Sequence, residues 1–373
     1  MGGTGSKIEL MVPPIILRPQ FPAGRRIVAV SDIHGNLPFF CGLMDKICFT
    51  PSDILVLVGD TLEKGQNSLA LLHHIMELSK THTIYPVCGN CDGLVLRFFE
   101  SDELDASFFS FYLDKHPEST LRQMAREGGF DQTTDLPALR QDLRAAYPEE
   151  WNFLRSMPTI LETEHLLFVH GGVPSLRNME KLNRWKCMKY DNFRGEGFSF
   201  DKYVIVGHWP TTLYHPDIPS SAPIFDWDQR IISIDGACVL KVDGQLNALL
   251  IPEESSEDFT WTAYDGLPTI TALDAQSPNP DPVNIRWGRS QLELLEHGEE
   301  LSLCRHLETG RVLPILNHYL QHKPEGLFCE DSTDYQLPVS PGDTLALVAV
   351  TRQGCLCKKD GCTGWYYGKF NYN

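Results

Sequence analysis

The sequence predicts an α/β domain with a mostly parallel sheet, followed by a smaller all-β domain. Two observations support this fold class. From residue 26 onward, short apolar runs alternate with segments of helical periodicity, which is typical of βαβ units. Beyond residue 282 the helical patterns stop, and short strand patterns follow one another closely. With 373 residues, the chain is long enough to form two domains with cores of their own.

Three strands and two helices are predicted in the first half of the α/β domain. The strands are expected at 27–30, 54–58 and 83–87, and the helices at 37–47 and 67–80. The segment 54–58 is an unbroken apolar run, as expected of a strand that is buried on both faces. In the second helix, apolar residues recur along one face at Leu69, Leu72, Ile75 and Met76.

A helical insertion is predicted at residues 93–157, because this segment is rich in leucine, phenylalanine and charged residues and has few strand signals. Strand patterns return at 159–162 and 165–169, which a tight turn joins, and again at 203–206 and 246–251. We also expect residues 230–234 and 238–242 to form a β-hairpin. Together these elements define a predicted α/β domain over residues 26–252.

Three further segments complete the chain. Residues 1–25 contain four prolines and are expected to form an extended lead-in; their first six residues fit a loose N-myristoylation pattern, although a glycine-rich leader is the simpler interpretation. Residues 253–282 combine an acidic stretch with a proline-rich run and predict a linker. In residues 283–373, strand patterns on either side of Glu308-Thr309-Gly310 predict a hairpin within a small barrel-like domain.

Composition excludes several classes of partner. The net charge is −17 and the pI is near 5.2, so that a basic surface for nucleic acid is not expected. No apolar run reaches the roughly 18 residues that a membrane span needs. The odd number of cysteines, 11, and the lack of a secretory signal predict a cytoplasmic protein with free thiols. A zinc site at Cys355, Cys357, Cys362 and Cys329 is a weaker interpretation, because the spacing is irregular.

Six polar residues follow the predicted strands and suit a two-metal site. They are Asp32, His34, Asp60, Asn90, His170 and His208. In open α/β sheets, ligands bind outside the carboxyl ends of the strands, where these residues stand. Two ions about 3.5–4 Å apart lower the pKa of a bridging water and hold a phosphoryl group. We expect Asp60 to bridge the ions, and the mixed imidazole and carboxylate ligands favour Mn, Fe or Zn over Ca.

The same residues stand in motifs that follow one another in a recognisable order: Asp32-Ile33-His34-Gly35-Asn36, Gly59-Asp60, Gly89-Asn90, His170-Gly171-Gly172 and Gly207-His208. Over residues 26–252 the chain resembles the calcineurin-like metallophosphoesterases, and among them the phosphoprotein phosphatase family of serine/threonine phosphatases, especially its bacterial members. The resemblance implies a two-sheet αββα sandwich and a dinuclear hydrolase that uses a metal-bridging hydroxide for in-line attack. The implied substrate is a phosphorylated protein.

Three residues depart from the pattern of that family. Cys91 stands where the family has the histidine that protonates the leaving group, while Glu63 and Lys64 replace an aspartate and an arginine. A thiol with an ordinary pKa of about 8.5 is a poor substitute for an imidazolium. We therefore expect aryl phosphates or phosphoanhydrides to be favoured over phosphoserine. The alternatives are a small-molecule phosphoanhydride hydrolase resembling the dinucleoside polyphosphatases, and a catalytically weak adaptor protein.

The remaining candidates have less defined roles. Asp92 is expected either to shape the catalytic pocket beside Cys91 and Glu63 or to cap the following helix. Asp235 either supports a metal ligand or closes a turn. Lys64, Asn90 and Lys189 are the candidates for contacts to substrate phosphate. Finally, residues 339–343 and 361–366 resemble bacterial Src-homology-like small barrels, which implies a peptide partner for the C-terminal domain.

Overall fold

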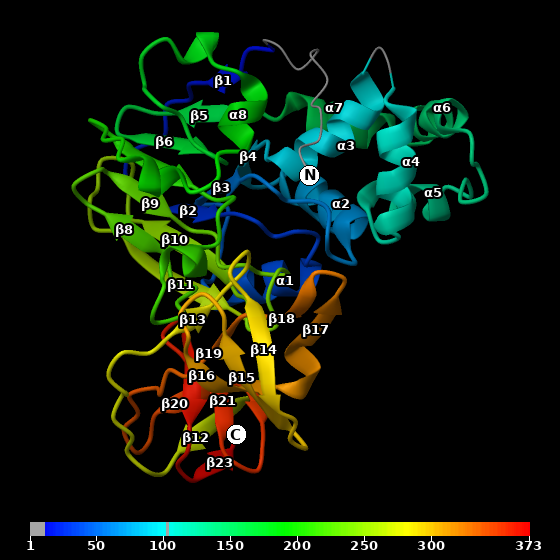
Figure 1. Cartoon of the computed structure of the whole chain (residues 1–373). Coiled ribbons are helices and arrows are strands. Elements are labelled where there is room, and N and C mark those ends of the chain that lie inside the picture. Colours follow the sequence, from blue (N-terminus) through cyan, green and yellow to red (C-terminus); the bar gives the residue numbers. More distant parts are fainter. Residues whose placement is uncertain (1–11, 102–103) are drawn as a thin grey trace. The chain divides into compact units, whose positions relative to one another are not determined.

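The computed structural model describes residues 12–101 and 104–373 (Figure 1). The N-myristoylation pattern and the first part of the expected lead-in lie outside these residues. The chain forms two compact units, of which the second contains residues 210–222, 240–245 and 265–373, and the first contains the rest. Among the described helices, none has the length and apolar character that crossing a bilayer requires.

One sheet of the first unit has the strand order β11-β10-β2-β3-β4. Its strands are β2 (Ile27–Val30), β3 (Ile54–Val58), β4 (Thr83–Val87), β10 (Leu246–Ile251) and β11 (Thr260–Tyr264). The predicted strands β2, β3 and β4 pair in parallel, and β10 and β11 add antiparallel edges. Helices α1 (Leu37–Lys46) and α2 (Ser68–Leu78) cover the outer face of this sheet. Helix α1 begins where the Asn36 side chain accepts a hydrogen bond from Phe39 N.

The other sheet of the first unit has the order β1-β5-β6-β7-β9-β8. Its strands are β1 (Ile16–Leu17), β5 (Ile160–Glu162), β6 (Leu166–Val169), β7 (Tyr203–Val206), β8 (Ile224–Asp226) and β9 (Ile231–Ser233). Phe168 and Ile205 pack with Val56 of the first sheet in one buried layer. The outer face is covered by α8 (Arg184–Met188) and the short helices η1 (Met179–Lys181) and η2 (Phe193–Glu196). The first unit is therefore the two-sheet αββα sandwich that the sequence predicts.

The predicted helical insertion is present between β4 and β5 (Figure 1). It consists of α3 (Asn90–Glu100), α4 (Ala106–Lys115), α5 (Thr120–Glu127), α6 (Leu136–Ala146) and α7 (Pro148–Ser156). Phe98, Phe99 and Phe109 are fully buried in its core. Helices α5 and α7 pack against α2, which fixes the insertion beside the first sheet.

Two predictions about segments after residue 228 are wrong. Residues 230–234 and 238–242 do not form a hairpin, because β9 pairs with β7 and β8 in the interior of the unit. The expected linker, 253–282, contains two strands: β11 pairs with β10, and β12 (Thr269–Ala272) pairs with β20 (Thr344–Val350). Both segments find their partners far away in the sequence, and the local composition does not show this.

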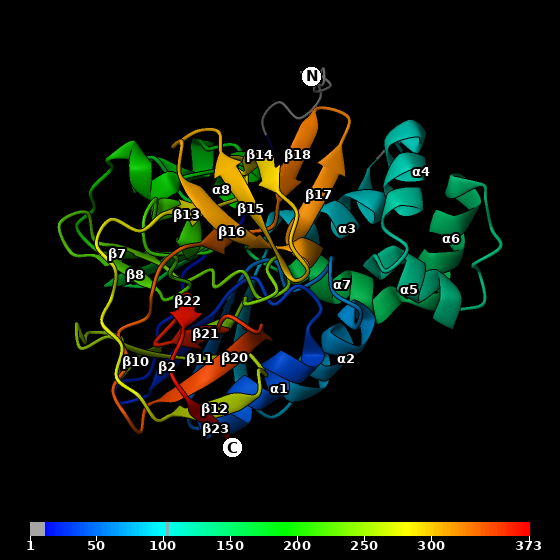
Figure 2. The same ribbon diagram turned by 60° about the horizontal axis from the view of Figure 1, so that its bottom comes forward.

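The second unit consists of antiparallel sheets (Figure 2). One five-stranded sheet has the order β22-β21-β20-β12-β23, with β21 (Cys355–Lys359), β22 (Cys362–Tyr366) and β23 (Phe370–Tyr372). The other has the order β16-β15-β14-β18-β17, with β14 (Gln291–Glu296), β15 (Leu301–His306), β16 (Val312–Leu316), β17 (Leu320–Lys323) and β18 (Gly326–Cys329). Strands β13 (Asn284–Ile285) and β19 (Ser332–Thr333) pair separately, and two short helices, η3 (Thr211–Tyr214) and η4 (Asn317–Tyr319), also belong to this unit. The hairpin predicted around Glu308-Thr309-Gly310 is confirmed as β15 and β16.

The second unit is built partly from two excursions of the preceding chain. In the first, Asn284 Nδ2 donates to the carbonyl oxygens of Thr212 and His215, at 3.2 and 2.8 Å. In the second, the buried Lys241 ammonium lies 3.4 Å from Asp243 Oδ1 and 3.3 Å from Asp331 Oδ2. These contacts make residues 210–222 and 240–245 integral parts of the β-rich unit.

We predict that Lys241→Met strongly destabilises the second unit. The substitution removes the cation from the buried Asp243 carboxylate and the partly buried Asp331 carboxylate, and such a loss typically costs about 3–5 kcal/mol. The free energy of unfolding from urea denaturation measures this loss. The control, Lys80→Met, removes an exposed ion pair with Glu77 and should leave the free energy of unfolding unchanged. Equal effects of the two variants would contradict the assigned role of Lys241.

Candidate metal centre

The six predicted ligands lie at one rim of the sandwich, just beyond the carboxyl ends of five strands. Asp32 and His34 follow β2, Asp60 follows β3, Asn90 begins α3 after β4, His170 follows β6, and His208 follows β7. The structure brings these separate segments together. Side-chain ligand atoms of Asp32, Asp60 and His170 all lie within 4.8 Å of one another, and the same holds for His34, Asp60 and Cys91.

The backbone at this rim is strained. Asp32, His34, Asp60 and His208 have φ values of 54°, 52°, 49° and 66°, a region that non-glycine residues seldom adopt. Hydrogen bonds between loops maintain these conformations: Asp32 N donates to Gly59 O, and His34 N donates to Asp60 O, both at 3.0 Å. Residues held in this way cost of order 1–3 kcal/mol each and occur mainly at functional sites.

Two glycines allow the segments to approach one another. A Cβ atom at Gly207 would collide with Asp32 Oδ2, and a Cβ atom at Gly89 would collide with Asp60. His208 N then donates to Asp32 Oδ2 at 3.0 Å. The glycines of these motifs are therefore needed for the close packing of ligand-bearing loops, as well as for their sharp turns.

His170 presents one nitrogen to the centre. Its Nδ1 donates to Val58 O at 2.8 Å, so that the buried Nε2 faces Asp60 Oδ1 at 3.3 Å and Asp32 Oδ1 at 4.0 Å. Burial by itself would lower the pKa of His170, but the Asp60 and Asp32 carboxylates raise it to about 10. Hydrogen bonding of Nδ1 to a carbonyl is the usual way in which a metal-binding imidazole is oriented.

Two buried carboxylates share this space. Burial, opposed by His170 and assisted by Asp60, raises the pKa of Asp32 to about 6. Burial also opposes ionisation of Asp60, but His170 and His34 hold its pKa well below the usual range. Negative charge in a buried place requires compensation by cations. Within the described residues, His170 Nε2 and Asn90 Oδ1 are buried and make no hydrogen bond; the Asn90 oxygen can bind a cation directly, and His170 Nε2 can do so when the cation displaces its proton.

His34 and His208 are held by different partners. His34 Nδ1 lies 3.3 Å from Leu62 O, and its Nε2 lies 4.0 Å from Asp60 Oδ2; burial and the Lys64 ammonium lower the pKa of His34 to about 3. His208 Nε2 lies 2.8 Å from Asp191 Oδ1, while burial and His170 lower the pKa of His208 to about 4. Both imidazoles are thus neutral, as metal binding requires.

The donor set therefore fits divalent cations. Asp32, His34, Asp60, Asn90, His170 and His208 would hold them, and Asp60 lies between the two groups of ligands. Carboxylate oxygens, imidazole nitrogens and one amide oxygen are ligands typical of Mn, Fe and Zn.

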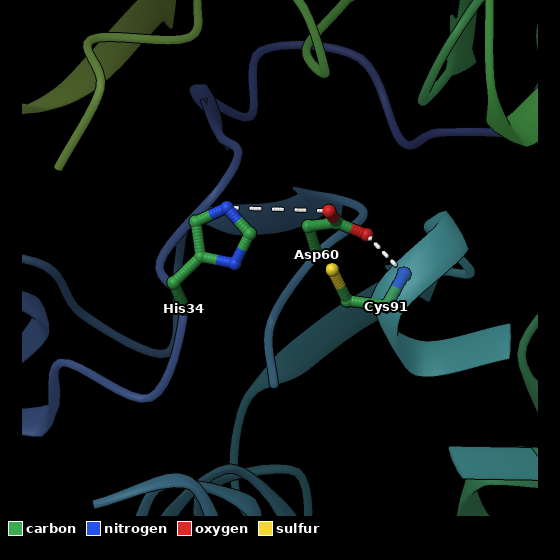
Figure 3. Close-up of side chains that lie close together, drawn as sticks. All are labelled: His34, Asp60 and Cys91. Atoms are coloured by element: carbon green, nitrogen blue, oxygen red, sulfur yellow. Dashed lines mark hydrogen bonds and ion pairs between the residues drawn. The ribbon is translucent and has the colours of Figure 1, made fainter. Parts of the chain in front are cut away.

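Cys91 lies at the edge of this centre (Figure 3). Its backbone N donates to Asp60 Oδ1 at 2.7 Å, and the side chain is 7% exposed. Burial and the Asp60 carboxylate raise the pKa of the Cys91 thiol well above its usual range. Without a bound cation, this position therefore holds a neutral thiol and no ready proton donor.

Asp92 and Glu63, which the sequence predicts to be catalytic, bind other parts of the protein. The Asp92 carboxylate accepts hydrogen bonds from Gly89 N and Leu62 N, both at 3.0 Å, and so joins the loops after β3 and β4. Glu63 Oε1 accepts from Thr120 N at 2.9 Å, and Glu63 Oε2 accepts from the Tyr112 hydroxyl. Their catalytic roles stay predictions, and the positions suggest that both residues fix the loops.

Three hydrogen-bond partners of the predicted site residues were not predicted from the sequence. Tyr112 and Thr120 reach Glu63 from the helical insertion, and Asp191 reaches His208 from the segment after α8. None stands in a motif or directly follows a strand, so no local signal marks it. Of the predicted phosphate contacts, Lys64 Nζ lies 3.4 Å from His34 Nε2, whereas Lys189 is an exposed residue at the end of α8.

Of the two predicted alternatives for Asp235, the structure shows the turn. Its Oδ1 accepts from Ala237 N at 2.8 Å, which closes a turn. Its Oδ2 is buried and makes no hydrogen bond within the described chain, and burial together with Asp32 raises the pKa of Asp235 well above its usual range. The side chain therefore supports the backbone, and a role toward a metal ligand stays a prediction.

Comparison with known proteins agrees with this geometry. The profile of the calcineurin-like phosphoesterases matches residues 25–233, and the chain therefore belongs to this family of metal-dependent phosphoester hydrolases. A stretch of 87 residues is 34% identical to the symmetrical bis(5'-nucleosyl)-tetraphosphatase of Glaesserella parasuis serovar 5. That match covers 21% of this chain and only 31% of the relative.

Solved structures show the same general similarity. One, provisionally named a diadenosine tetraphosphatase, is 17% identical and gives a TM-score of 0.45, covering 67% of this chain and 98% of its own. A protein serine/threonine phosphatase from Saccharomyces cerevisiae is 12% identical with a TM-score of 0.40, covering 68% of this chain and 85% of its own. Neither similarity is strong enough to bear on the substrate.

We predict that Gly207→Ala weakens metal binding. The added methyl group displaces the Asp32 carboxylate, and we expect the affinity for Mn or Zn to fall by roughly tenfold or more. Calorimetric titration of each metal measures the change. Gly197→Ala is the control: at its φ of 76° the alanine adds backbone strain, but a Cβ atom there has no neighbour within 4 Å. Unchanged affinity in Gly207→Ala would refute the steric argument.

Removal of metal should lower the thermal stability of the protein. A ligand at about 100 times its dissociation constant stabilises the native state by about 2.7 kcal/mol. We therefore expect the melting temperature to fall in chelator and to recover when Mn or Zn is added. His170→Gln should abolish the recovery. His73→Gln, which removes only a contact with Glu150, should retain it, and loss of recovery in both variants would argue against His170 as a ligand.

Proposed function

We propose that this protein hydrolyses phosphoanhydrides and other phosphate esters whose leaving groups need little protonation. The observation that supports this most directly is Cys91, a buried sulfur side chain at the place where the family resemblance implies an acidic histidine. When bound, the two divalent ions supply an activated water and neutralise charge on the phosphoryl oxygens.

The residues of the chain would bind and orient the phosphoryl group. Lys64 presents its ammonium beside His34; desolvation opposes its charge, but Cys91 and the Asp60 and Asp32 carboxylates raise the pKa of Lys64. The group thus stays cationic and attracts a phosphate oxygen. Since Lys acts as a point charge and lacks the fork of arginine, it orients the phosphate less strictly.

The leaving group decides between substrates. An alkoxide from phosphoserine is strongly basic and gains much from a proton donor, whereas a nucleoside phosphate leaves as a weak base. Among the side chains around Asp60, His34 and His170 are arranged as ligands, and the Cys91 thiol is a poor acid. The relative from Glaesserella parasuis, named as a tetraphosphatase, supports the same substrate class over its matched segment.

A protein phosphatase of the serine/threonine type is the second candidate. It follows from the motif resemblance, in which Gly59–Gly65 and Gly207–Thr211 are similar to segments of those enzymes. In this case the substrate is a phosphorylated protein, and the β-rich unit binds a peptide. None of the eleven cysteines, all of which lie within the described residues, forms a disulfide, which supports the cytoplasmic location that we propose.

A substrate panel with a variant at residue 91 tests the proposal. We expect the wild type to turn over diadenosine tetraphosphate and an aryl phosphate faster than a phosphoserine peptide. Cys91→His should raise kcat for the peptide by roughly 10²-fold, the lower end of general-acid contributions. Cys91→Ala, which removes the thiol without supplying an acid, should give no such gain. Preference of the wild type for the phosphoserine peptide would favour the second candidate instead.

A further inference from the structure

Cys91 belongs to a group of three side chains that can surround one ion. Ligand atoms of His34, Asp60 and Cys91 all lie within 4.8 Å of one another, and all three residues are buried. Figure 3 shows the imidazole, the carboxylate and the thiol pointing into the same space. The cluster lies beside the group formed by Asp32, Asp60 and His170, with Asp60 common to both.

The distances are close to those of a coordinated ion. Zinc binds thiolate sulfur at about 2.3 Å and imidazole nitrogen at about 2.0–2.1 Å, so that the ligands of one tetrahedral ion lie roughly 3.3–3.6 Å apart. His34 Nε2 and Asp60 Oδ2 are separated by 4.0 Å, slightly more than this range.

Local contacts hold the sulfur in position. Cys91 N donates to Asp60 Oδ1 at 2.7 Å, and this bond fixes residue 91 against the shared carboxylate. Asn90 Nδ2 donates to Cys91 Sγ at 3.5 Å, while Asn90 Oδ1 remains buried without a hydrogen bond. The Asn90 amide can thus offer its oxygen to one ion and a hydrogen bond to the sulfur beside the other.

We propose that Cys91 is a thiolate ligand of the ion held by His34 and Asp60, and that the centre consequently selects a thiophilic metal. Coordination forms a metal–sulfur bond and releases the thiol proton to solvent. A ligand set of sulfur, nitrogen and oxygen favours Zn or Fe(II) over Mn and Mg, which prefer oxygen. This role of Cys91 as a metal ligand goes beyond the proposed function, which requires only that Cys91 does not protonate the leaving group.

Cobalt substitution tests the sulfur ligand directly. We expect Co(II) added to the metal-free full chain to produce a near-ultraviolet sulfur-to-cobalt charge-transfer band at stoichiometric metal. The band should vanish in Cys91→Ser and persist in the matched control Cys88→Ser. Cys88 is also buried, but its Sγ lies 3.5 Å from Gly89 O and it belongs to neither ligand cluster.

Two outcomes would overturn the proposal: no charge-transfer band although cobalt binds the wild type, or a band that survives in Cys91→Ser. If the variant fails to fold, X-ray absorption of the zinc-loaded wild type decides, because a sulfur ligand appears at about 2.3 Å. If the absorption spectrum shows only oxygen and nitrogen ligands around the zinc, Cys91 is not a ligand.

Metal preference supplies an independent readout. In Cys91→Ser, the affinity for Cd(II) should fall by roughly tenfold or more, while that for Mn(II) changes little. An equal loss for both metals would indicate a structural effect and count against the proposal. The measurement is also separate from substrate class: a wild type that shows the cobalt band but does not hydrolyse anhydrides refutes the proposed function alone.

Discussion

The site depends on the buried carboxylate of Asp60. Its Oδ1 accepts a hydrogen bond from Cys91 N and lies 3.3 Å from His170 Nε2, while its Oδ2 lies 4.0 Å from His34 Nε2. One side chain therefore connects the loops that follow β2, β3, β4 and β6. Because a buried negative charge is costly when it is unpaired, this arrangement is stable only with positive charge around it. His170 and the Lys64 ammonium supply positive charge beside Asp60, and bound divalent ions would add to it.

The sandwich makes such a site possible because it supports strained backbone. The loops carrying Asp32 and Asp60 adopt positive φ angles, and strands packed on both faces prevent them from relaxing. Gly89 and Gly207 permit close approach at the points where a side chain would collide with a carboxylate. The ligands are therefore positioned before any ion binds, which reduces the cost of ordering them.

The chain leaves this rim in two places to build the β-rich unit. Pro210 begins the first excursion, two residues after His208, and Leu240 begins the second, five residues after Asp235. The buried charges of Lys241 and Asp243 fix the second excursion within that unit. The two proposals for Cys91 are mutually consistent. A thiolate that is bound to a metal has no proton to donate to a leaving group, and phosphoanhydrides need such a proton least.

The sequence by itself determined the strands and the residues that end them. Segments 27–30, 54–58 and 203–206 are predicted to the residue, because unbroken apolar runs mark buried strands. The ligands are predictable for a related reason: polar residues directly after such runs must lie at the sheet edge. Tertiary structure alone decided the pairing of β9, the strands within 253–282, and the contacts of Tyr112 with Glu63 and Asp191 with His208. Local patterns encode periodicity and burial, whereas these pairings join segments far apart in the chain and depend on how the whole fold packs.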